Sequence, residues 1–292
     1  MRQLLTASRM GALQRCPYYH WLRYEIGLRS LVTADALRFG SAWHRAMEAR
    51  HNGAEITAAL VAGIGDRTEV DEVQVATLSG MLAGYYHHYG EDRWQVVPEL
   101  EFSYALRRGR GAMWASGKID GIITGTRCMV LECKTAGADI GPDSDYWLRL
   151  RGNLQVLQYV EGARSLGYDP QCVIYDVARK PGIRVKQAET IEEYGDRLAA
   201  DTIERPGFYF ARREVPIIEA ELMRFRSERD ALAKEIAWRR RACAWPRAVS
   251  ERVCMTCEFS GFCLQGVVPT AEDVPGGFVV GGLHEELTEV AQ

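Results

Sequence analysis

The 292-residue sequence lacks any apolar run of about 18 residues, the length that indicates a membrane-spanning helix. Its first residues also lack the apolar core of a signal peptide. From these two absences we expect a cytoplasmic protein that makes no membrane contact. A G-x-x-x-x-G-K-[ST] phosphate loop is missing as well, so the sequence predicts no nucleotide-driven motor. We find no internal repeat.

Strong charge of one sign is also absent, since the formal net charge is only −3. A near-neutral chain neither favours nor excludes a nucleic-acid partner, because such binding depends on local patches. The chain has eight cysteines, and disulfides are rare in the cytoplasm. Metal binding or plain burial is therefore expected for the cysteines.

The first third of the chain is predicted to be mostly helical. Residues 6–28 indicate a short helix, a Cys-Pro break and then an aromatic helix, with Thr6 or Ser8 as the first N-cap. Residues 34–51 and 70–90 also have helical patterns.

From about residue 97 the sequence predicts strands and one long helix. We therefore expect an α/β fold with a central mixed β-sheet, flanking helices, a helical N-terminal region and a C-terminal lobe rich in cysteine. A charged helix over 217–243 should turn an apolar stripe to the core, and the tail, without Lys or Arg, should be loosely held. The predicted strands are 98–106, 113–123, 127–135 and 171–180, and the long helix is 146–167, closed by Gly167.

The stretch "MVLECKTA" (129–136) ends a predicted buried strand with two opposite charges. Because side chains alternate along a strand, Glu132 and Lys134 share an outward face while Cys133 points into the core. If the preceding turn is an odd loop centred on Thr126, Asp120 lies opposite Glu132, at about 5 Å between Cβ atoms. A divalent cation would neutralise these two carboxylates. An even loop would separate them, and an exposed ladder of salt bridges is the alternative interpretation.

The C-terminal cysteines have the spacing C-x2-C-x5-C at Cys254, Cys257 and Cys263. Three cysteines leave a four-ligand site incomplete, and Cys16 is the natural fourth ligand, with Cys243 in competition. Four thiolates suit either Zn²⁺ or a [4Fe–4S] cluster. The remaining cysteines lie on predicted strands and are expected to be buried: Cys128, Cys133 and Cys172.

Several short motifs occur in a fixed order along residues 8 to about 265. This ordered set closely resembles the PD-(D/E)xK nuclease superfamily, and more narrowly its RecB-like branch with an iron–sulfur cluster, which includes the CRISPR-associated exonucleases and the AddB nuclease domain. The motifs are "RFGSAWH" with His44, "SGKID" with Asp120, "LECK" with Glu132 and Lys134, "LQVLQY" with Gln155 and Tyr159, and the four cysteines at 16, 254, 257 and 263.

The resemblance implies a metal-dependent hydrolytic site with a restriction-endonuclease-like core. Asp120, Glu132 and the Cys133 backbone carbonyl would ligate Mn²⁺ or Mg²⁺, and His44 would be a further ligand. Lys134 would orient or deprotonate the attacking water. The alternative for His44 is a core histidine that packs near Gly40.

Other residues take roles from the same resemblance. Gln155 and Tyr159 share one helix face and would lie beside the active site, although an amide that packs with an aromatic ring is the alternative. Glu99 and Glu101 are candidates for one more acidic position, and Glu101 is the tentative choice. Tyr175 would either line the cleft or pack.

The resemblance also divides the chain into four regions. Residues 1–95 are a helical region that contributes Cys16 and His44, and residues 96–216 are the nuclease core. Residues 217–265 carry the last helix and three cluster cysteines, and residues 266–292 are an acidic tail. A [4Fe–4S] cluster is implied, with a structural role, although spacing alone leaves zinc open.

We therefore expect a DNA exonuclease that acts on single strands or DNA ends, in recombination, repair or CRISPR and phage DNA processing. A helicase, recombinase or integrase partner would supply unwinding. The alternatives are a DNA-end-binding adaptor with minor nuclease activity and a zinc-stabilised scaffold. Candidate DNA contacts are the arginines at 107, 108, 110, 149, 151, 212, 213 and 239–241, and the aromatic run "YYHHY" at 85–89.

Overall fold

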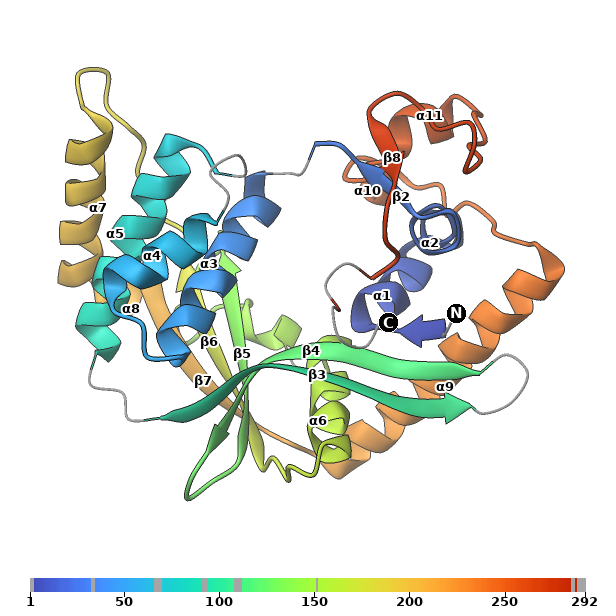
Figure 1. Cartoon of the computed structure of the whole chain (residues 1–292), viewed down its shortest axis with the longest axis horizontal. Helices are drawn as coiled ribbons and strands as arrows, with labels where there is room; N and C mark the ends of the chain where they lie inside the picture. The colour runs from blue at the N-terminus through green and yellow to red at the C-terminus, as the bar shows by residue number, and fades with distance from the viewer. Residues whose placement is uncertain are drawn as a thin grey trace.

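A computed structural model of the chain describes residues 3–32, 35–65, 70–90, 94–107, 112–150, 152–284 and 287. Its centre is a six-stranded mixed sheet in the order β1-β4-β5-β6-β7, with β3 paired to β4 (Figure 1). β1 pairs with β4, and β5 with β6, in parallel, while the other pairs are antiparallel. The strands are β1 Gln3–Leu5, β3 Gln95–Arg107, β4 Met113–Thr124, β5 Met129–Ala136, β6 Cys172–Arg179 and β7 Phe210–Pro216.

The long strand β4 organises the molecule. One edge pairs with β3 over most of its length. The other edge pairs with β1 at residues 113–115 and with β5 at residues 121–123. Residues 116–120 lie between these two partners, and on this edge they have no strand partner among the described residues. This gap in the sheet is where side chains and helices can approach the β4 backbone.

Helices cover both faces of the sheet. Apolar side chains of α3 and α5 pack on one face together with Leu131 and Cys133 of β5, while α6 and Leu222 of α9 pack on the other face together with Val130. Since neighbouring residues of β5 reach opposite cores, its apolar run is explained by burial on both sides. The helices of this part are α3 Asp35–His51, α4 Ile56–Ile64, α5 Glu72–Tyr89, α6 Leu154–Ser165, α7 Ile191–Glu204, α8 Pro206–Tyr209 and α9 Glu219–Ala242, with the short 3-10 helix η2 Trp147–Leu150.

A second group of elements, which we call the cysteine lobe, stands over the far end of the β3–β4 ribbon (Figure 1). It brings the two ends of the chain together, because β2 pairs with β8 in antiparallel fashion. Its core cluster contains Leu22, Leu28, Phe259 and Phe262. The lobe consists of α1 Ala7–Arg15, α2 Pro17–His20, the π-helix η1 Trp21–Ile26, β2 Leu28–Ser30, α10 Glu251–Cys254, α11 Ser260–Leu264 and β8 Phe278–Val280.

Most predicted elements are confirmed. The first helix ends before Cys16, and Thr6 is its N-cap, because its hydroxyl accepts a hydrogen bond from the backbone N–H of Arg9. The predicted odd loop is also confirmed, since Gly121 pairs with Leu131 and Ile123 with Met129. The same register places Asp120 at the level of Glu132.

Two structural predictions are wrong. The long helix over 146–167 is interrupted, because Gly152 adopts φ of 70° and Asn153 then caps α6 through its side chain. The tail is not loosely held throughout, because Phe278–Val280 forms a strand against β2. The sequence patterns also missed the short strands β1 and β2.

Some predictions cannot be followed in the structure. Arg108, Arg110, Arg151 and the side chains of Arg107 and Arg149 lie outside the described residues. Within the described ranges, no helix combines the length and the apolar character that crossing a membrane requires.

Candidate active site

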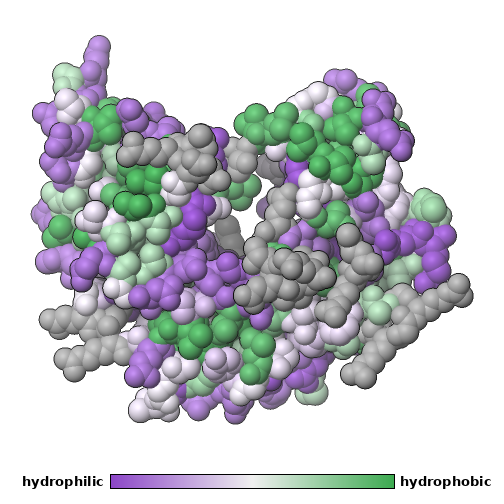
Figure 2. Space-filling view, in the orientation of Figure 1, coloured by the Kyte–Doolittle hydropathy of each residue, from purple (hydrophilic) through white to green (hydrophobic). Residues whose placement is uncertain are grey.

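A cleft of about 1430 Å³ lies between α3 on one side and the start of α1, the first helix of the cysteine lobe, on the other. Figure 2 shows the molecule hollowed at this place. The floor is the strand gap in β4, with Gly117, Lys118 and Asp120. One wall is α3 with Gly40 and His44, and the other walls come from the start of α1 and from α6. The fold therefore brings residues of three predicted motifs to one cleft, from α3, β4 and α6, whereas Glu132 and Lys134 of β5 do not line it.

Asp120 is held between the hairpin and α3. Its Oδ2 accepts a hydrogen bond from the backbone N–H of Cys133 at 2.8 Å, and His44 Nδ1 lies 3.5 Å from the same oxygen. Burial acts to raise the pKa of Asp120, but His44, Lys134 and the Cys133 N–H lower it overall. Asp120 is thus kept ionised beside an imidazole, which is a donor set suited to a divalent cation.

Glu132 is the most unusual charge of the site. Its side chain has no exposed surface and forms an ion pair with Lys134. Within the described part of the chain neither carboxylate oxygen has a hydrogen-bond partner, since the ammonium stands beside Oε1 without hydrogen-bond geometry. Burial, and then the charge of Asp120, raise the pKa of Glu132 to about 7. A buried carboxylate without hydrogen bonds is costly, so this pair of oxygens fits a cation ligand.

The predicted orientation of the β5 side chains is confirmed only in part. Cys133 lies in the core with 3% exposure, as expected. Glu132 does not face outward, because α6 and the neighbouring strands cover it completely. Only Lys134 reaches solvent, with a quarter of its side chain exposed.

Lys134 is connected to α6 by a short chain of hydrogen bonds. Its Nζ donates to Gln155 Oε1 at 2.8 Å, and Gln155 Nε2 donates to the Tyr159 hydroxyl at 2.9 Å. Gln155 and Tyr159 line the cleft on one helix face. Gln155 of the predicted Gln–Tyr pair therefore contacts the lysine of the hairpin directly, and Tyr159 is connected to it through Gln155.

The tentative acidic residue needs correction. Glu101 pairs with Lys118 across the β3–β4 ladder and is not among the residues that line the cleft. Glu99 lines the cleft and forms an ion pair with Lys118. Its backbone adopts φ of 55°, which is uncommon for a residue other than glycine, so regular strand alternation between the two acids is lost. This backbone conformation could not be predicted from strand periodicity.

The cleft lining contains four charged residues that the motifs did not predict as site residues, namely Arg45, Glu48, Lys118 and Lys180. Glu48 lies one turn after His44 on α3, and Lys118 lies two residues before Asp120. The i,i+4 spacing of His44 and Glu48 places them on one helix face and was the available signal.

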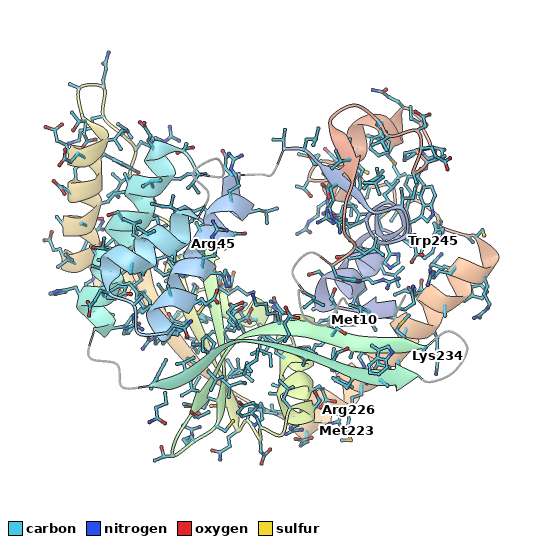
Figure 3. The ribbon with its side chains drawn as sticks, in the orientation of Figure 1. Met10, Arg45, Met223, Arg226, Lys234 and Trp245 are labelled. Atoms are coloured by element: carbon cyan, nitrogen blue, oxygen red, sulfur yellow. The ribbon has the colours of Figure 1, made fainter. Side chains whose placement is uncertain are left out.

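Most of the predicted DNA-contacting cations and aromatics have structural partners elsewhere. Arg212 binds the buried Asp176, with Nε 2.8 Å from Oδ2. Tyr85 has no exposed surface, and Tyr175 is buried with its hydroxyl bonded to the Leu150 carbonyl. The cations that line the cleft are instead Arg45, labelled on α3 in Figure 3, and the lysines 118 and 180.

The four cysteines of the predicted cluster line one cavity in the cysteine lobe. Cys243 lines a different cavity with Trp245, so it does not compete for that position. Burial raises the pKa of Cys257 and of Cys263. Within the described part of the chain, however, no three His, Cys, Asp or Glu side chains form a group that could hold a metal ion, in this lobe or in the cleft. The cluster thus stays a prediction.

Comparisons with known proteins agree with this arrangement. The model of the PD-(D/E)XK nuclease superfamily matches residues 4–264. A solved structure of a candidate exonuclease from Eubacterium rectale is similar in fold, with a TM-score of 0.53 and 13% identity over 89% of this chain and 88% of that one. The structure of SSO0001 has 14% identity over 78% of this chain and 85% of that one, but its TM-score of 0.34 carries no argument. No curated protein matches the sequence.

Proposed function

This chain belongs to the PD-(D/E)XK nuclease superfamily, and from that premise we propose that it is a metal-dependent DNA exonuclease that acts on single strands or DNA ends. The observation that carries the proposal is the buried Glu132 carboxylate, which has no hydrogen bond and lies at the level of the ionised Asp120. Asp120 lines an open cleft with Lys118, Lys180 and Arg45 on its surface, where phosphates can bind, and Glu132 is buried next to it without lining the cleft.

The donor types suit Mn²⁺ or Mg²⁺, although the His44, Asp120 and Glu132 side chains do not converge as a metal-binding group within the described residues. Asp120, Glu132, the Cys133 carbonyl and His44 would hold the ion, which would lower the pKa of a bound water and favour hydroxide. Lys134 would orient that water, and Gln155 and Tyr159 hold the ammonium in place through the chain of hydrogen bonds described above. Arg45 and the cleft lysines would position the DNA backbone.

We also propose that Cys16, Cys254, Cys257 and Cys263 hold a [4Fe–4S] cluster. Support comes from the shared cavity, from a thiol donor set that suits such a cluster, and from the small core of the lobe, in whose cluster four apolar residues are buried. The cluster would clip the first helices to the C-terminal segment. Protein purified without oxygen should be brown, with absorption near about 400 nm and about four irons per chain. A colourless protein that contains stoichiometric zinc would overturn the proposal.

The function is tested with linear single-stranded DNA labelled at either end, linear duplex and closed single-stranded circles, each with Mn²⁺, Mg²⁺ or chelator. We expect degradation of the linear single strand that requires metal and is abolished in Asp120→Ala. Asp139→Ala is the matched control, because Asp139 follows the neighbouring strand β5 but is exposed and paired with Arg179. Tight DNA binding without turnover would contradict the enzyme and favour the adaptor.

A further inference from the structure

Gln158 of α6 is a fully buried polar residue that the proposed mechanism does not use. It has 0% exposure and does not line the cleft, although Gln155 and Tyr159 on the same helix do. Its Nε2 donates two hydrogen bonds of 2.8 Å, one to the Leu5 carbonyl and one to the Ser116 carbonyl. Its Oε1 has no partner. The amide therefore joins two backbone segments that are far apart in sequence.

The position of these carbonyls explains why an amide is needed there. The parallel ladder between β1 and β4 ends with the pair Leu5 and Ala115. The chain leaves β4 at Thr6, which caps α1. The β1–β4 ladder does not continue beyond this pair, and a buried carbonyl without a hydrogen-bond donor costs about 1–3 kcal/mol. The two N–H groups of Gln158 supply donors to the Leu5 and Ser116 carbonyls in place of a further strand pair.

Both segments lead directly into the cleft. Leu5 precedes Thr6, Ala7 and Ser8, which form the α1 wall, and Ser116 precedes Gly117 and Lys118 on the floor. We propose that Gln158 is a positioning residue that fixes the distance between the α1 wall and the β4 floor, and with it the binding of the DNA strand. This inference rests on the proposed nuclease function.

The test is Gln158→Met, which keeps the length of the side chain and removes both donors. Because a displaced wall weakens contacts made equally to substrate and transition state, KM for a linear single strand should rise roughly tenfold with kcat within about twofold. Thr202→Val is the matched control. Thr202 is also fully buried and bonds two main-chain carbonyls, those of Gly80 and Ala199, but on α7 away from the cleft.

Hydrogen exchange gives a second readout that does not depend on activity. In Gln158→Met, exchange should accelerate in residues 3–11 and stay unchanged in α3. If that variant does not fold, Gln158→Glu, which when protonated keeps one donor, carries the same test. Unchanged KM and unchanged exchange would overturn the role of Gln158. A wild-type protein without metal-dependent cleavage would instead overturn the proposed function. In that case hydrogen exchange alone would test whether Gln158 holds the two segments together.

Discussion

The sheet region and the cysteine lobe differ in the interactions that stabilise them. The sheet has a large apolar core on each face, and around its buried charges Asp120 and Lys134 find nearby partners. The core cluster of the cysteine lobe has four buried apolar residues, of which Phe262 keeps 8% exposure. It also contains a nearly unexposed arginine, Arg9, held by Glu25, His20 and the Leu4 carbonyl.

The difference suggests separate roles, with the candidate active site in the sheet region and a structural role for the cysteine lobe. Of the hairpin carboxylates that the structure describes, Asp120 is held by a backbone N–H while both buried Glu132 oxygens lack hydrogen bonds, so the proposed metal would bind to a site that is already largely formed. In the lobe a small core leaves little apolar surface to stabilise the fold, and small domains of this kind usually need a covalent or metal link. We therefore expect the cleft metal to be needed for activity and the cluster for structure.

The largest expected effect is at Glu132. Glu132→Gln removes the charge in the same shape, so cleavage of a labelled single strand in Mn²⁺ should fall at least about 10³-fold, because a metal ligand and its charge are lost. The melting temperature should change little, since the removal of a buried carboxylate and the loss of its ion pair with Lys134 act in opposite directions. A variant that retains most of its activity, or melts well below wild type, would contradict this role.

The next largest effect should be confined to the other region. Cys254→Ser should remove the absorption near 400 nm and accelerate hydrogen exchange in the cysteine lobe about 100-fold, with the sheet unchanged. Cys243→Ser is the matched control, because Cys243 lies in a separate cavity. Equal acceleration in β5 and β6 would show that the two regions do not differ in this way.

The sequence predicted the hairpin site better than the rest because its residues are close together in the chain. The odd loop at Thr126 was enough to place Asp120 at the level of Glu132, and alternation was enough to bury Cys133. Glu132 is buried on the face of β5 where α6 packs, and α6 comes from a later segment of the chain. Strand periodicity therefore could not predict that Glu132 is buried. For the same reason the partners of Arg212 and of Gln158 were not predictable.

Acid should weaken the sheet region through His51. Burial, opposed by Asp176 and assisted by Arg50 and Arg212, lowers the pKa of His51 to about 4. Between about pH 6.5 and 4 the unfolded chain binds a proton that the folded chain does not, so stability is full above this window and falls with pH. From pH 7 to pH 5 this histidine should cost about 2 kcal/mol in urea unfolding.

The variant His51→Gln should lose that much less stability over the same pH interval. His88→Gln, at an exposed histidine of α5, is the control and should follow wild type. The pKa of His20 in the cysteine lobe is also lowered, to about 3, and His20 is present in both proteins. The contribution of His51 is therefore the difference in pH-dependent stability between wild type and His51→Gln. Parallel pH profiles for His51→Gln and wild type would exclude the effect.

The smallest expected effect separates two acids of one strand. Glu99 lies in the cleft and pairs with Lys118, whereas Glu101 lies outside the cleft lining. Glu99→Gln should therefore reduce kcat/KM on a linear single strand about tenfold, which corresponds to about 1.4 kcal/mol. Glu101→Gln should change it less than about twofold, because surface substitutions are usually near neutral. The reverse order would restore Glu101 as the acidic site residue and would mean that the φ of 55° at Glu99 does not turn its carboxylate toward bound DNA or metal.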